Sequence, residues 1–101
     1  MNPKTFILIV DDDVSILDVL RQSLSLEGYT CQAFTRGEDA LEALERMHAE
    51  VLLTDIVMPG MRGLELVSKA KRLHPSMTAI VMTGFVEEFS YLRNTARLVV
   101  L

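Results

Sequence analysis

The 101-residue chain has few of the features that would tie it to a membrane or to a disulfide framework. It contains one cysteine, Cys31, so it cannot form an intrachain disulfide, and this suits a reducing compartment. No apolar run approaches the roughly 18 residues of a membrane-spanning helix. The apolar run at residues 6–10 is too short for the core of a signal peptide. These absences favour a cytoplasmic protein without a membrane segment.

Basic residues are also too few and too scattered to suggest a nucleic-acid-binding surface. The chain has 10 Lys and Arg against 14 Asp and Glu, a formal net charge of −4, and no basic stripe. Since binding to phosphate backbones requires clustered positive charge, we expect no direct contact with nucleic acid. The sequence also has no linker, low-complexity segment or repeat. Its length is that of one small domain, so we expect a single domain over residues 1–101.

What the sequence does contain is a regular alternation of short apolar runs and amphipathic segments. Apolar runs rich in β-branched residues predict buried parallel strands, at residues 6–10, 29–34, 51–54, 78–83 and 97–101. Apolar residues at helical spacing predict helices between them, at residues 14–27, 37–49, 64–74 and 86–96. Gly28 is placed to end the first helix. This alternation predicts an α/β fold with a doubly wound parallel sheet and helices on both faces.

Carboxylates gather where two of the predicted strands end. Asp11, Asp12 and Asp13 follow the first predicted strand, and Asp55 follows the third. Ligands of open parallel sheets bind beyond the carboxyl ends of the strands, and carboxylates packed together repel one another unless a cation lies among them. Mg²⁺ prefers such oxygen ligands. We therefore predict a magnesium site at Asp11, Asp12 and Asp55, whereas Asp13 is predicted to cap the following helix.

Three motifs together resemble the receiver domain of bacterial two-component response regulators: ILIVDDD, LLTDIVMPGMRGLEL and AIVMTGF. The resemblance covers about residues 4–91, and residues 92–101 are atypical. It implies a flavodoxin-like sheet in the order 2-1-3-4-5, here with a short fifth strand and no fifth helix. It also implies a phosphoacceptor module rather than an enzyme, phosphorylated by a sensor histidine kinase. The downstream effector is not identified by the sequence.

The resemblance assigns a role to each residue of the site. Asp55 would accept the phosphoryl group, Asp12 would coordinate Mg²⁺ directly, and Asp11 would act largely through water. The other assigned residues surround the phosphoryl group: the Val57 carbonyl as a metal ligand, Thr83 as a hydrogen-bond donor to a phosphoryl oxygen, Gly84 as space for that group, and Pro59 and Gly60 as residues that shape the loop.

The chain departs from the receiver pattern at two places. Arg62 stands where receivers usually carry Asp, and an exposed position there should make this change inconsequential. The final segment, residues 97–101, lacks the lysine and the aromatic residue that receivers carry on or after the fifth strand. Without a fifth helix, apolar surface of the first and last strands would be exposed, so the sequence predicts self-association.

Two other functions fit parts of the sequence. A haloacid-dehalogenase-like phosphatase would use Asp11 and Asp13 as its Asp-x-Asp motif and Thr83 as its second motif, but it leaves Asp55 without a role. A receiver remnant that folds without switching is the second alternative. His48 and His74 lie near predicted helix ends without partners at metal-ligand spacing, so they are expected to be solvated helix-end residues.

Overall fold

Five parallel strands form the centre of the computed structural model, which describes residues 5–82 and 98–100. The sheet order is β2-β1-β3-β4-β5. The strands are β1 (Phe6–Val10), β2 (Thr30–Phe34), β3 (Val51–Asp55), β4 (Thr78–Met82) and β5 (Leu98–Val100), and the helices are α1 (Val14–Leu26), α2 (Gly37–Leu44) and α3 (Gly63–Leu73). The predicted α/β class and strand order are confirmed. The helix predicted at residues 86–96 lies outside the described residues.

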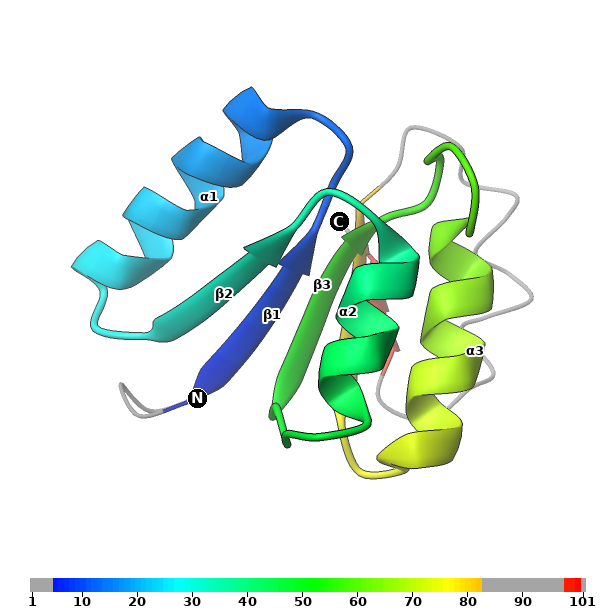
Figure 1. Ribbon diagram of the computed structural model, residues 1–101. Coiled ribbons are helices and arrows are strands. Elements are labelled where there is room, and N and C mark those ends of the chain that lie inside the picture. The colour runs from blue at the N-terminus through cyan, green and yellow to red at the C-terminus, as the bar shows by residue number, and fades with distance from the viewer. Residues whose placement is uncertain (1–4, 83–97, 101) are drawn as a thin grey trace.

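The helices cover both faces of the sheet, as Figure 1 shows. In a strand, alternate side chains point to opposite faces. Accordingly, Leu8 and Val10 of β1 join a core with buried residues of α2 and α3, whereas Ile7 and Ile9 pack with Leu17 of α1. All four of these β1 side chains are at most 2% exposed, so the prediction that apolar surface of the first strand would be exposed was wrong for these residues, which the sheet and α1 cover. An apolar run that is buried on both faces is typical of a central parallel strand, so the sequence of β1 is explained by its place in the sheet.

Both ends of α1 follow from local sequence. Asp13 is the N-cap, and its carboxylate accepts from the Ser15 N–H at 2.9 Å. At the other end Gly28 has a φ of 95°, a conformation that glycine adopts without a steric penalty. The Gly28 N–H donates to the Ser25 carbonyl and the Tyr29 N–H to the Leu24 carbonyl, which is the Schellman arrangement. The predicted glycine stop is therefore confirmed.

The predicted extent of α2 was wrong, because the helix ends at Leu44 rather than at residue 49. In a longer helix the Leu44 carbonyl would accept from the N–H of His48. Here that carbonyl lies 2.7 Å from the Nε2 atom of His74, a residue of the neighbouring helix end. The last turn also tightens, since the Arg46 N–H donates to the Ala43 carbonyl at 3.0 Å. A tertiary contact therefore takes over the carbonyl that would continue the helix.

Candidate functional site

Three carboxylates meet at the carboxyl edge of the sheet. The strands β1 and β3 are neighbours, and Val10 is paired with Thr54, so the residues that follow them lie side by side. Asp11, Asp12 and Asp55 each offer one carboxylate oxygen, and these oxygens all lie within 4.8 Å of one another. The convergence predicted for these three aspartates is therefore seen in the geometry. Oxygen ligands at such separations fit a hard divalent cation.

Asp11 is the buried member of this acidic cluster, with only 2% of the residue exposed. Its backbone N–H donates to the Phe34 carbonyl at 3.1 Å, and its Oδ1 atom accepts from the Asp13 N–H at 2.9 Å. Burial raises the pKa of Asp11 above its ordinary value of 3.8, and the nearby carboxylates of Asp55 and Asp12 raise it further, although the bond from Asp13 opposes them. A bound cation would offset this electrostatic cost.

The third aspartate of the run plays a separate, structural part. Asp13 points its carboxylate at the start of α1, where Oδ1 accepts from the N–H groups of Ser15 at 2.9 Å and Ile16 at 3.4 Å. This is the helix cap that the sequence predicts. The phosphatase alternative needs Asp13 as a chemical partner of Asp11, but the carboxylate is committed to the helix N-terminus. The geometry therefore favours Asp55, and not Asp13, as the partner of Asp11.

Asp55 ends β3 and is held by several backbone contacts. Its Oδ1 atom accepts from the Val57 N–H at 3.3 Å, and its carbonyl accepts from the hydroxyl of buried Thr54 at 2.9 Å. The next residue, Ile56, is fully buried and donates its N–H to the Met82 carbonyl at 3.3 Å. Val57 is 52% exposed, so the loop reaches solvent immediately beyond the acidic cluster. Asp55 thus combines a fixed backbone with a partly accessible carboxylate.

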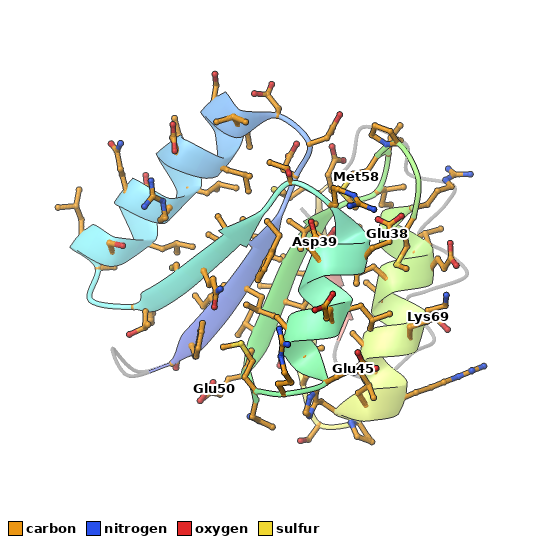
Figure 2. All side chains as sticks on the ribbon, in the orientation of Figure 1. Glu38, Asp39, Glu45, Glu50, Met58 and Lys69 are labelled. Carbon is orange, nitrogen blue, oxygen red and sulfur yellow. The ribbon has the colours of Figure 1, made fainter. Side chains whose placement is uncertain are left out.

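The loop that follows, residues 56–62, packs against the start of α2, and this contact was not predicted from the sequence. Gly60 has a φ of 75°, and a Cβ atom there would lie 3.0 Å from Oε2 of Glu38. The other oxygen of Glu38, Oε1, is buried without a hydrogen-bond partner among the described residues. Met58 of the same loop is buried in the core beneath α2, and Figure 2 shows Glu38 and Met58 at this end of the molecule. Hydrophobic periodicity alone gives no signal for such a loop contact.

The remaining predicted site residues divide into two groups. Val57 and Gly60 lie in the described loop beside Asp55, whereas Thr83 and Gly84 lie outside the described residues. Arg62 is exposed, as predicted, and is the residue immediately before α3. The described residues therefore contain the carboxylate part of the predicted site but not its predicted hydroxyl.

The raised pKa of Asp11 predicts a pH dependence of the metal-free protein. A carboxyl group whose pKa is higher in the folded state favours folding when protonated, so this contribution is lost as the pH rises from 3.8 through the raised value. We expect Asp11→Asn to raise the melting temperature in EDTA at neutral pH. We also expect the melting temperature of this variant to fall less steeply than that of the parent chain as the pH rises above 4. Asp18→Asn, on the exposed surface of α1, is the matched control. Identical pH profiles for Asp11→Asn and the parent chain would contradict the assignment.

Comparisons with known proteins agree with this architecture. Residues 7–97 match the family described as the response regulator receiver domain. The DNA-binding transcriptional regulator NtrC of Escherichia coli K12 is 47% identical over 81 residues, which cover 80% of this chain but only 17% of NtrC. The response regulator receiver protein CpdR of Brucella abortus is 38% identical over 79 residues, 78% of this chain and 66% of CpdR. The chain thus spans a small part of NtrC and about two thirds of CpdR.

Solved structures show the same fold at higher coverage. The response regulator TrrA of Thermotoga maritima, in complex with Mg²⁺-BeF, superposes with a TM-score of 0.84 at 29% identity and covers 96% of this chain and 86% of TrrA. A CheY-like receiver domain protein of Methanospirillum hungatei also gives 0.84, at 35% identity, with 96% of this chain and 81% of that one covered. Both the sequence motifs and the sheet order are explained by this relationship. The chain therefore belongs to the response regulator receiver domain family, the phosphoacceptor modules of two-component systems.

Proposed function

We propose that this chain is a cytoplasmic protein that accepts a phosphoryl group on Asp55 from a sensor histidine kinase, with the help of one Mg²⁺ ion. The observation that carries the proposal is the meeting of Asp11, Asp12 and Asp55 at one edge of the sheet. A structural role does not account for this cluster, because the repulsion among the three carboxylates raises the free energy of the metal-free folded state. The Mg²⁺-BeF complex of TrrA supports both the ion and the phosphoryl position.

In this proposal each aspartate has its own task. Exposed Asp12 and the carboxylate of Asp55 would bind the ion directly, and buried Asp11 would act largely through water. The carbonyl of Val57 would supply a further oxygen ligand. The N–H of Val57 donates to Oδ1 of Asp55, which orients the second carboxylate oxygen toward an incoming phosphorus. A Mg²⁺ ion held by these residues would neutralise the charge that builds up on the phosphoryl oxygens.

The transfer itself is a displacement at phosphorus. A carboxylate oxygen of Asp55 forms the new P–O bond while the P–N bond of the donor phosphohistidine breaks, and the electron pair of that bond stays on the imidazole nitrogen, which then takes up a proton. The product is an acyl phosphate. Catalysis in such steps consists mainly of positioning and charge neutralisation, which fits a site made of strand ends and carboxylates. We further propose that the hydroxyl of Thr83 donates a hydrogen bond to a phosphoryl oxygen and that Gly84 leaves room for the phosphoryl group.

Labelling with acetyl phosphate tests the proposal. With Mg²⁺ present, the intact mass of the chain should increase by one phosphoryl group, and EDTA should prevent this increase. A chromogenic phosphate ester, incubated in parallel, should not be turned over. Turnover of the ester without labelling of the chain would instead support the phosphatase alternative.

Metal binding predicts a difference in thermal stability. A ligand that binds only the folded state stabilises it by mass action, so Mg²⁺ should raise the melting temperature. Asp12→Ala should abolish most of this increase and should raise the metal-free melting temperature, because it removes one of the repelling charges. Asp39→Ala, an exposed acidic residue at the start of α2, is the control for a general effect of charge. A full Mg²⁺ response in Asp12→Ala would place the metal site elsewhere.

A further inference from the structure

We propose a second metal site, in which His48 and His74 bind a divalent transition metal such as Zn²⁺ at the end of the molecule opposite the acidic cluster. The helices α2 and α3 both begin at the carboxyl edge of the sheet and end at its other edge (Figure 1). His48 lies between α2 and β3, and His74 is the C-cap of α3. These are the only two histidines of the chain, and 26 positions of sequence separate them, yet the fold brings their rings together.

The geometry of the two rings suits a shared ion. Their centroids are 4.9 Å apart and their planes are inclined at 83°. With Zn–N bonds of about 2.0–2.1 Å and tetrahedral angles, two imidazoles on one zinc ion have centroids roughly 5 Å apart. The centroid separation in the structure is therefore close to the one that a shared zinc ion requires.

The hydrogen bond of His74 fixes which of its nitrogens can bind. Nε2 lies 2.7 Å from the Leu44 carbonyl oxygen, and a carbonyl can only accept, so Nε2 carries the hydrogen. In the neutral ring the lone pair is then on Nδ1. Histidines that bind metals almost always donate their other N–H to a carbonyl or carboxylate, which orients the ring and raises its basicity. His74 already has this supporting bond.

The two histidines are open to solvent, and both acidic and basic side chains lie at the same end of the molecule. His48 is exposed and His74 is half-buried, so water can complete the coordination shell. Among the residues described, no third Asp, Glu, Cys or His joins the two rings within ligand distance. The carboxylates of Glu45 and Glu50 lie at this end of the molecule (Figure 2). Two basic side chains of α3 and of the segment after α2 have partners of their own. Nζ of Lys71 donates to the Met77 carbonyl at 3.0 Å, and Nη2 of Arg46 lies 3.6 Å from Oε1 of Glu42 in an ion pair.

The two proposed sites differ in the ions that they select. Imidazole nitrogen binds Zn²⁺, Cu²⁺ and Ni²⁺ far better than Mg²⁺, whereas carboxylates and water suit Mg²⁺. An ion on both histidines would tie the segment after α2 to the end of α3. It would therefore stabilise the packing of these two helices without touching Asp55.

Zinc titration of the full chain, without a polyhistidine tag and with excess Mg²⁺ to fill the acidic cluster, tests the proposal. We expect calorimetry to show one Zn²⁺ per chain and NMR to show shifts of both imidazoles. His48→Gln should weaken Zn²⁺ binding at least tenfold, and because His48 is exposed this change should leave the fold intact. His74→Gln should weaken Zn²⁺ binding equally. Because glutamine can still donate to the Leu44 carbonyl, this change too should leave the fold intact. Cys31→Ser, which removes the only cysteine, is the control and should bind as the parent does.

The pH dependence separates this site from a binding mode that does not involve imidazole. Binding should weaken as the pH falls, because protons compete with the metal for the imidazole nitrogens. Unchanged Zn²⁺ affinity in both histidine variants would overturn the proposal. So would loss of binding in Cys31→Ser, or shifts confined to Asp11, Asp12 and Asp55.

Discussion

Asp55→Asn should leave the chain completely unlabelled by acetyl phosphate under conditions in which the parent chain is labelled. Asparagine has nearly the same shape and its carbonyl oxygen can still accept from the Val57 N–H, a contact of 3.3 Å in the parent. It cannot form an acyl phosphate, because an amide oxygen is a poor nucleophile at phosphorus and carries no charge. The fold should therefore persist while the chemistry is lost. Intact-mass measurement after matched incubation times gives the result directly.

Asp13, the aspartate that follows Asp11 and Asp12 in the sequence, provides the control for this experiment. Asp13→Asn changes the same residue type in the same way, but Asp13 caps α1, and asparagine caps helices about as well as aspartate. This variant should be labelled as fully as the parent chain. Equal labelling of Asp55→Asn and Asp13→Asn would show that the phosphoryl group is carried by another residue, and peptide mapping would then locate it.

Gly63→Ala should destabilise the protein strongly and should also weaken labelling at Asp55. A Cβ atom on Gly63 would overlap the carbonyl oxygen of Asp55 and would lie 2.8 Å from the Cα atom of Ile56. Both are backbone atoms, which cannot rotate away. The Gly63 N–H also donates to the Ile56 carbonyl at 2.9 Å, so the start of α3 is held against the end of β3. The added methyl group must force these two segments apart.

The expected size of this effect follows from overpacking. Extra methyl groups in closely packed sites cost about 1–3 kcal/mol, and a clash with backbone should lie at the upper end of this range. For a domain of this size, that corresponds to a fall in melting temperature on the order of 10–20 °C. Thermal melts monitored by circular dichroism would measure the fall, and the labelling rate would show whether displacement of the Asp55 backbone reaches its carboxylate.

Gly37→Ala is the matched control, because Gly37 is likewise the first residue of a helix and is likewise buried. Its added Cβ would meet only the side chain of Met61, at 3.4 Å, and methionine is flexible enough to move. Alanine also favours the helix. Gly37→Ala should therefore be neutral or slightly stabilising. A comparable loss of stability in both variants would indicate a general intolerance of helix-start substitutions rather than the close approach to Asp55.

Much of the fold was predictable because local sequence and buried position agree. The runs at residues 6–10 and 78–83 predict strands that the structure has at Phe6–Val10 and Thr78–Met82. The same holds for the carboxylates: residues that end adjacent parallel strands must meet at one edge, so Asp11 and Asp55 could be brought together from their positions alone. The cap at Asp13 was equally visible, since its residue type and its place before an apolar helical pattern both indicate it.

The features that could not be predicted depend on contacts between segments distant in the sequence. Nothing near Leu44 indicates that its carbonyl will be used by His74, 30 positions away, and so the end of α2 was missed. His48 and His74 are too far apart in the sequence to be recognised as a pair of metal ligands. They meet only because α2 and α3 run in the same direction and end at the same edge of the sheet. The close approach of Glu38 to Gly60 is of the same kind, since Glu38 lies at the start of α2 and Gly60 in the loop before α3.

The shallow burial of α1 has a consequence for how the molecule opens. Leu17 is the one buried residue of this helix, whereas Val14, Val19 and Leu26 are all more than half exposed. Detaching α1 uncovers one apolar face of β1, whereas separating β1 from its neighbours exposes a strand that is buried on both faces. Local opening of α1 should need much less free energy than global unfolding. Its amide hydrogens should exchange with solvent long before those of β1 and β3, so that the sheet under the acidic cluster remains intact while its covering helix detaches and returns.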